Sequence, residues 1–161
     1  MSNTPDTPTY PLLLSLVQTA HAALDQLLQL LLQEQNLLTH NQIDQLAALS
    51  LQKHQAASVA ETAGERLQTA LQSIGVDNDI DVAAWFTRYA PESLEAWQQL
   101  RETARQAALY NRSNGQLIET RRQLLDQFVT QLASARGDSL SYSKAGQLRG
   151  GSGGSLSRDK I

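Results

Sequence analysis

Several residue types are scarce in this sequence, and each scarcity excludes a class of structure. There is no cysteine, which rules out a disulfide framework and any thiolate site and fits a reducing compartment. Aromatic residues make up only 5%, so leucine and alanine must supply most of a core. After position 11 the only proline is Pro91, and β-branched residues are sparse. These features favour helices that pack side by side over a sheet.

No Lys or Arg precedes Lys53 in the chain. A secretory signal would need a basic residue ahead of its apolar segment. The best membrane candidate, residues 12–32, is interrupted by Asp25 and by several Gln, Ser, Thr and His residues, so it cannot span a bilayer unaided. We therefore expect a cytoplasmic protein with no membrane insertion.

The charge is unevenly distributed. Residues 136–161 hold five basic and two acidic side chains, a balance of +3, and the formal net charge of -3 leaves -6 for the remainder. A body this acidic argues against nucleic-acid binding, which needs a concentrated basic face.

The length of 161 residues predicts one all-α domain with flanking segments. We expect a disordered N-terminus over residues 1–8, a helical bundle over 9–135, and a disordered, flexible Gly/Ser-rich tail over 136–161. The expected architecture is a coiled-coil-like three-helix bundle: a long antiparallel helical hairpin, a third long helix, and a short connecting helix.

The helical hairpin is predicted from the spacing of apolar residues. A seam with alternating steps of four and three residues, seven of its eight members apolar, predicts a first helix that ends near a break at Asn41. A second pattern runs from about Gln42 to Ile74, with Gly75 as its stop. The seam of the first helix consists of Leu13, Val17, Ala20, Leu24, Leu27, Leu31, Glu34 and Leu38.

A short helix over residues 82–89 is expected to connect the hairpin to the third long helix. Trp85, Phe86 and Tyr89 lie together in it. We expect them to plug one end of the hairpin, with an exposed docking site as the alternative.

The third long pattern contains an Asn-Gly pair at 114–115, which is a strong turn signal. Two seven-residue series nevertheless pass through it without a change of phase, so we predict one helix from about Glu92 to Ala135. The series are Trp97, Ala104, Asn111, Ile118, Leu125 and Leu132, and Leu100, Ala107, Asn114, Arg121, Phe128 and Ala135.

Asn111 and Asn114 thereby fall on consecutive inward positions. Buried Asn side chains can fix the register of packed helices at a cost in stability. We predict that the two residues hydrogen-bond to the first or second helix and set the register of the third, with Gly115 allowing close approach.

No catalytic, cofactor or metal site is expected. His21, His40 and His54 have no acidic partners at metal-ligand spacing, and no phosphate-binding glycine loop precedes a helix. No Ser or Thr has a base and an orienting acid at a recognisable spacing. The sequence predicts a protein that is not an enzyme.

Four stretches, in order, resemble the flagellar export chaperones called FlgN. They are "LLTHNQIDQLAALSLQK" ending at Lys53, "LQSIG" ending at Gly75, "LYNRSNGQLIETRRQLL" at 109–125, and "YSKAG" with Tyr142 and Gly146. The resemblance covers nearly the whole chain. It implies a cytoplasmic chaperone that masks the helical terminal segments of hook-filament junction proteins, the hook-associated proteins. It also implies delivery of these clients to gate components of the flagellar type III export apparatus.

The third helix and the tail supply the predicted partner-binding residues. Leu124, Leu125, Phe128 and Leu132 suit a client's amphipathic helix or the intramolecular core, and the sequence leaves both open. In the tail, Leu140, Tyr142 and Leu148 are apolar contacts for the client or the gate. Arg121 and Arg122 are expected to be solvated, with a client salt bridge as the alternative. The alternative function is a structural coiled-coil adaptor that homodimerises through its long helices.

Overall fold

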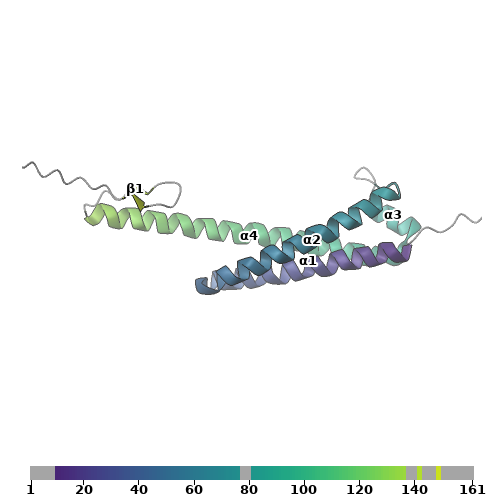
Figure 1. Ribbon diagram of the computed structural model, residues 1–161, viewed down its shortest axis with the longest axis horizontal. Coiled ribbons are helices and arrows are strands. Elements are labelled where there is room, and N and C mark those ends of the chain that lie inside the picture. Colours follow the sequence, from purple (N-terminus) through teal and green to yellow (C-terminus); the bar gives the residue numbers. More distant parts are fainter. Residues whose placement is uncertain (1–9, 77–80, 137–140, 143–147, 150–161) are drawn as a thin grey trace, which may run out of the picture. The chain divides into compact units, whose positions relative to one another are not determined.

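The computed structural model describes residues 10–76, 81–136, 141–142 and 148–149, and helices account for nearly all of them (Figure 1). The all-α prediction is confirmed. The predicted N-terminal segment, residues 1–8, lies outside the described residues. In chain order the elements are α1 (Tyr10–Thr39), a 3-10 turn η1 (Ile43–Gln45), α2 (Leu46–Ser73), α3 (Val82–Tyr89), α4 (Pro91–Arg136), β1 (Ser141–Tyr142) and β2 (Leu148–Arg149).

The chain divides into two compact units, one that ends at Leu117 and one that begins at Ile118. Helix α4 contributes to both.

In the first unit, α1 and α2 form the predicted hairpin. Helix α1 ends where Asn41 takes a positive φ of 59°, and the Gln42 amide donates to the Leu37 carbonyl at 2.9 Å. Asn tolerates this left-handed conformation better than most residues. The second helix ends in the same way at Gly75, whose φ is 81°. Both ends lie where the sequence predicts them.

Helix α3 closes the hairpin. The Asp81 carboxylate caps it by accepting from the amides of Ala83 and Ala84 at 3.0 and 3.2 Å. Phe86 is fully buried, with its ring centroid 5.5 Å from that of Trp97, so it plugs the hairpin as predicted. Tyr89 does not, because the residue is 45% exposed, and the Arg88 guanidinium lies over its ring.

Helix α4 runs through the Asn-Gly pair as one helix, as predicted. Its first part packs against α1 through one stripe of buried residues. Residue numbers increase in the same direction along both helices at their contacts: Thr103 contacts His21, and Asn114 contacts Leu31. The two helices are therefore parallel, and α4 is antiparallel to α2. The buried stripe consists of Leu100, Thr103, Ala107 and Asn114.

The second unit contains the rest of α4 and a short antiparallel ladder. Strands β1 and β2 pair Ser141 with Arg149 and Tyr142 with Leu148. The remaining residues of the predicted tail lie outside the described residues.

Candidate functional site

A buried polar cluster joins three helices of the first unit. The Asn114 side chain is 1% exposed, and its Nδ2 donates to the Leu31 carbonyl at 2.8 Å and to Glu34 Oε2 at 3.0 Å. Lys53 Nζ on α2 pairs with Glu34 Oε1 at 2.6 Å. Glu34 therefore connects α2 and α4 through α1. We call Glu34, Lys53 and Asn114 the polar cluster.

The polar cluster fits the predicted role of Asn114. A buried carboxylate is costly unless it is paired and hydrogen-bonded, so a shift of either neighbour along its axis would leave Glu34 unsatisfied. Asn114 Oδ1 has no hydrogen-bond partner within the described chain, so the amide acts here as a donor. Register setting by Asn114 remains a prediction. Sequence reasoning missed the Glu34–Lys53 pair, although Glu34 was the one charged residue in the apolar seam of α1.

Asn111 and Gly115 lie differently from the prediction. Asn111 is exposed and lies on the wall of an open groove, outside the buried stripe of α4. The reason is that α4 meets α1 through one stripe, while α2 does not close over the adjacent stripe. A Cβ added at Gly115 would have nothing within 4 Å, so the predicted close approach is wrong. The inward position of Asn111 is wrong as well.

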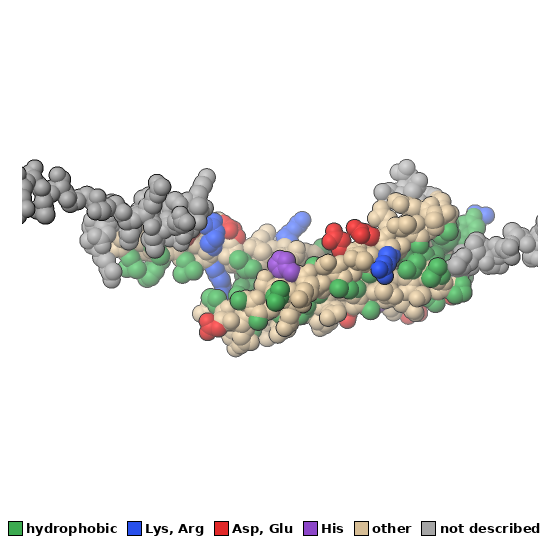
Figure 2. Space-filling view, in the orientation of Figure 1, with side chains coloured by type: hydrophobic (Ala, Val, Ile, Leu, Met, Phe, Trp, Pro, Cys, Tyr) green, Lys and Arg blue, Asp and Glu red, His purple; other side chains and the backbone are tan. Residues whose placement is uncertain are grey.

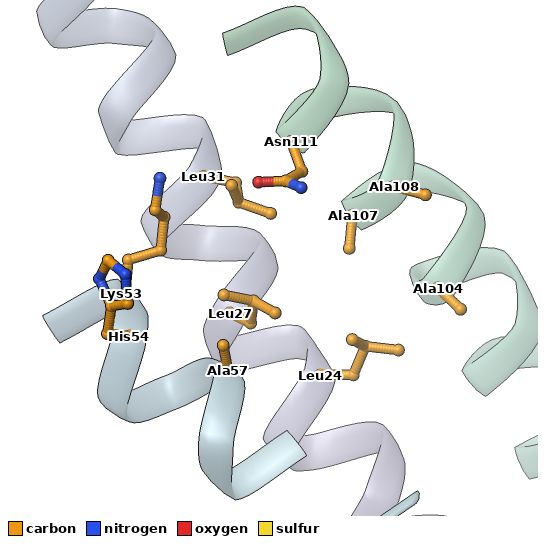
Figure 3. Close-up of a pocket in the computed structure, with 10 residues that line it drawn as sticks. All are labelled: Leu24, Leu27, Leu31, Lys53, His54, Ala57, Ala104, Ala107, Ala108 and Asn111. Atoms are coloured by element: carbon orange, nitrogen blue, oxygen red, sulfur yellow. The ribbon is translucent and has the colours of Figure 1, made fainter. Parts of the chain in front are cut away.

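An open groove lies between α2 and α4 in the first unit, with α1 as its floor (Figure 3). Its volume is about 480 Å³. Alanines form most of the α4 wall and one residue of the α2 wall, leucines form the floor, and the polar groups lie toward one end. The lining residues are Leu24, Leu27 and Leu31 of α1, Lys53, His54 and Ala57 of α2, and Ala104, Ala107, Ala108 and Asn111 of α4.

The second unit presents large apolar side chains to solvent. The predicted residues Leu124, Leu125, Phe128 and Leu132 are 59%, 61%, 59% and 45% exposed, and Ile118 and Val129 are 44% and 41% exposed. Figure 2 shows hydrophobic side chains along this segment of α4. We call Ile118, Leu124, Leu125, Phe128, Val129 and Leu132 the apolar strip. Such a continuous strip on a helix is typical of a binding surface.

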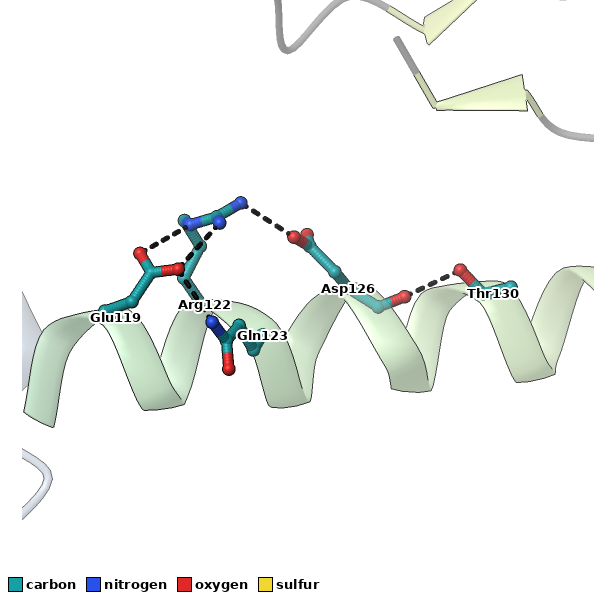
Figure 4. A network of polar contacts seen from close by, with 5 residues as sticks. All are labelled: Glu119, Arg122, Gln123, Asp126 and Thr130. Carbon is teal, nitrogen blue, oxygen red and sulfur yellow. Dashed lines mark hydrogen bonds and ion pairs between the residues drawn. The ribbon is translucent and has the colours of Figure 1, made fainter. Parts of the chain in front are cut away.

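Charged side chains on the same segment form a local network (Figure 4). Arg122 bridges Glu119 and Asp126 with distances of 2.9 Å on each side. Hydrogen bonds from Arg122 and then from Gln123 lower the pKa of Glu119. Arg121 is half-buried. Arg122 is thus exposed and ion-paired in the free chain.

The predicted tail residues are only partly described. Tyr142 and Leu148 are opposite each other in the β1–β2 ladder, and Leu140 lies outside the described residues. Their contacts with a client or gate remain predictions.

The three histidines and the acidic residues do not form a metal site in the described part of the chain. Among the described residues no group of three or more His, Asp and Glu side chains is placed to hold a metal ion. His21 bonds with the Thr103 hydroxyl at 3.1 Å, and His40 and His54 bond with carbonyls of their own helical segments. Within the same part of the chain, none of the helices combines the length and apolar character that crossing a bilayer requires.

Comparison with known proteins provides one match. The family model described as FlgN protein matches residues 9–150. No curated protein and no solved structure matches the chain. The matched region includes all four helices, the polar cluster, the groove and the apolar strip. Because the match covers most of the 161 residues, the chain belongs to the FlgN family, a family of flagellar export chaperones.

Proposed function

We propose that this chain binds the helical terminal segments of hook-filament junction proteins in the cytoplasm, prevents their premature assembly, and delivers them to the flagellar type III export gate. Family membership supports the chaperone role. The observation that carries the choice of client is the apolar strip, in which six large side chains of one helix are 41–61% exposed.

The spacing of the apolar strip suits a helical ligand. Ile118, Leu125 and Leu132 recur every seven residues, and Leu124 and Phe128 are one turn apart. An amphipathic helix that docks on another presents anchors at i, i+3, i+4 and i+7, which match such a strip. A terminal segment that polymerises through an amphipathic helix is thereby masked until export.

The tail is proposed to reinforce this contact. Residues 136–161 are too poor in large apolar side chains to form a core of their own, yet Leu140, Tyr142 and Leu148 are spaced along them. Ordering the tail around a client costs conformational entropy, which moderates affinity and favours release at the gate. Removal of residues 136–161 should therefore leave helical content largely intact and weaken client capture.

A paired substitution tests the apolar strip. Leu125→Ser with Phe128→Ser should weaken binding of a purified junction protein, measured by calorimetry, about 100-fold, since each removes an anchor worth about 1–2 kcal/mol. Leu51→Ser on α2 is the matched control, because Leu51 is 64% exposed and lies outside the strip. Equal binding by the double variant and the control would refute the assignment of the strip.

The oligomeric state of the free protein distinguishes the coiled-coil adaptor from the chaperone. If the apolar strip pairs two copies, light scattering should show a stable dimer that the double Ser variant dissociates, with no effect of deleting residues 136–161. The chaperone proposal instead expects the deletion to change client binding.

A further inference from the structure

The groove between α2 and α4 in the first unit has no role in the proposed function. Helices α1, α2 and α4 are side by side there, and a fourth helix between α2 and α4 would complete a four-helix arrangement. A second hollow, between α1 and α2, is smaller at about 230 Å³, and three of its six lining residues are glutamines. The groove has the larger volume and a floor of leucines.

We infer that the groove is a second client-binding site, which takes an amphipathic helix with large aliphatic side chains on one face and acidic side chains beside them. This inference rests on the proposed function, because it takes the helix from the same client. The small side chains of the walls, the apolar floor and the charge of the rim all favour such a helix.

The walls suit a helix. Ala57, Ala104 and Ala108 are small and exposed, so a neighbouring backbone can approach closely and insert larger side chains between them. Ala104 and Asn111 are seven residues apart on α4, which is the repeat that a helical partner follows. Leu24, Leu27 and Leu31 on the floor are partly or fully buried, and contact with a partner's leucines would remove their remaining apolar area from water.

The rim supplies charge complementarity. Arg101 and Arg112 are seven residues before and four after Ala108, so they lie along the same stripe of α4. Both are exposed, and neither forms an ion pair within the part of the chain that the structure describes. Across the groove, Lys53 and His54 lie at the same end as Arg112, since Lys53 and Asn114 share Glu34.

Glu34 is buried against Lys53, and the exposed acidic group Glu61 lies toward the other end of the rim. Glu61 follows Ala57 by one turn of α2, away from Lys53. Glu34 offsets the charge of Lys53, so Arg112 makes the exposed rim at this end positive, although the body of the protein is acidic overall. A helix with Asp or Glu beside its apolar face would place them at this end, whereas a basic helix would be repelled.

Filling the groove tests the inference. The probe is a synthetic peptide of the terminal helical segment of a hook-filament junction protein, titrated into the full-length chain. Ala108→Phe should weaken binding about 10-fold, because it occupies the space a client side chain needs. Ala48→Phe is the matched control, since Ala48 is exposed on the opposite face of α2 from Ala57. Circular dichroism checks that each variant is folded.

Charge reversal provides a second variant that leaves the packing alone. Arg112→Glu should weaken peptide binding about 3–10-fold at low salt and less at high salt, as for a rim charge. Arg66→Glu on α2 is a control for net charge, because Arg66 is exposed and does not line the groove.

Cross-linking locates the peptide directly. Because the chain has no cysteine, a photoreactive group attached through R101C, at a position that is exposed and outside the groove lining, reports one position without filling the groove, and A48C serves as its control. Cross-linking from position 101 but not 48 supports the groove. Normal binding by Ala108→Phe and Arg112→Glu, with no cross-link from 101, overturns the groove and leaves the proposed function standing. Failure of the unmodified chain to bind the peptide overturns both.

Discussion

Helix α4 has two parts that follow the same seven-residue spacing and have opposite environments. In residues 91–117 the series through Leu100, Ala107 and Asn114 is at most 9% exposed. In residues 118–136 the same series reaches Phe128, which is 59% exposed. The periodicity of a helix therefore indicates which side chains share a face. It does not indicate whether another part of the chain covers that face.

A local motif occurs in both parts and behaves alike in each. "ETARQ" at 102–106 and "ETRRQ" at 119–123 place an Arg three residues and a Gln four residues after a Glu. In both, the Arg and the Gln donate to the same carboxylate. Short-range helix geometry fixes these surface pairs, whereas burial depends on residues distant in sequence.

The largest difference in stability between the two parts of α4 is expected when one leucine in each part is replaced with alanine. Leu100→Ala should destabilise the protein by about 2–5 kcal/mol, because it leaves a cavity in the core. Leu125→Ala should change stability by less than about 0.5 kcal/mol, since the side chain is 61% exposed. Urea unfolding followed by circular dichroism measures both. Similar losses would mean that the apolar strip is covered in the free protein.

Replacing each of the two asparagines with alanine should change the stability of the protein in opposite directions. Asn114→Ala should cost about 1–3 kcal/mol, because it removes two buried donors from the polar cluster. Asn111→Ala should instead stabilise the protein by about 0.5 kcal/mol, because Asn111 is exposed and Ala is the better helix former. Thermal unfolding compares them. A loss from Asn111→Ala as large as that from Asn114→Ala would restore the symmetrical role that the sequence suggests.

Gly115→Ala should stabilise the protein by about 1 kcal/mol, since a methyl group there meets nothing within 4 Å and Gly is a poor helix residue. The same unfolding assay applies, with Gly64→Ala on α2 as its counterpart in equally open space. Destabilisation by Gly115→Ala alone would show that a neighbour does approach the backbone at this position.

The sequence predicts the helices of this protein better than the contacts between them. The helices and their ends at Asn41 and Gly75 follow from local spacing and turn chemistry, and the structure confirms them. The inward position of Asn111 was wrong, because a seven-residue repeat cannot specify which of two adjacent stripes meets α1. The partner of Asn114 was also beyond prediction, since Glu34 is 80 residues away in the chain. The groove was not predicted for the same reason, because three segments that are distant in sequence form it.

The smallest effect tests whether the two Glu-x-x-Arg-Gln motifs are independent. Hydrogen bonds from Arg105 and then Gln106 lower the pKa of Glu102 to about 2 from 4.5, and the same causes lower the pKa of Glu119. A lowered pKa in the folded state stabilises that state above the unfolded pKa, and this contribution is lost as the pH falls from about 4.5 to about 2. The loss should be small, because both carboxylates are exposed.

Carboxyl titration by NMR separates the two sites. Arg105→Gln should raise the pKa of Glu102 toward 4.5 and leave that of Glu119 unchanged, and Arg122→Gln should do the converse. Added salt should weaken both shifts, as for exposed charges. If Arg105→Gln also moved the titration of Glu119, the motifs would be coupled through the helix. The division of α4 at Leu117 would then not hold for its surface charges, and binding at the apolar strip would be expected to respond to substitutions in the first unit.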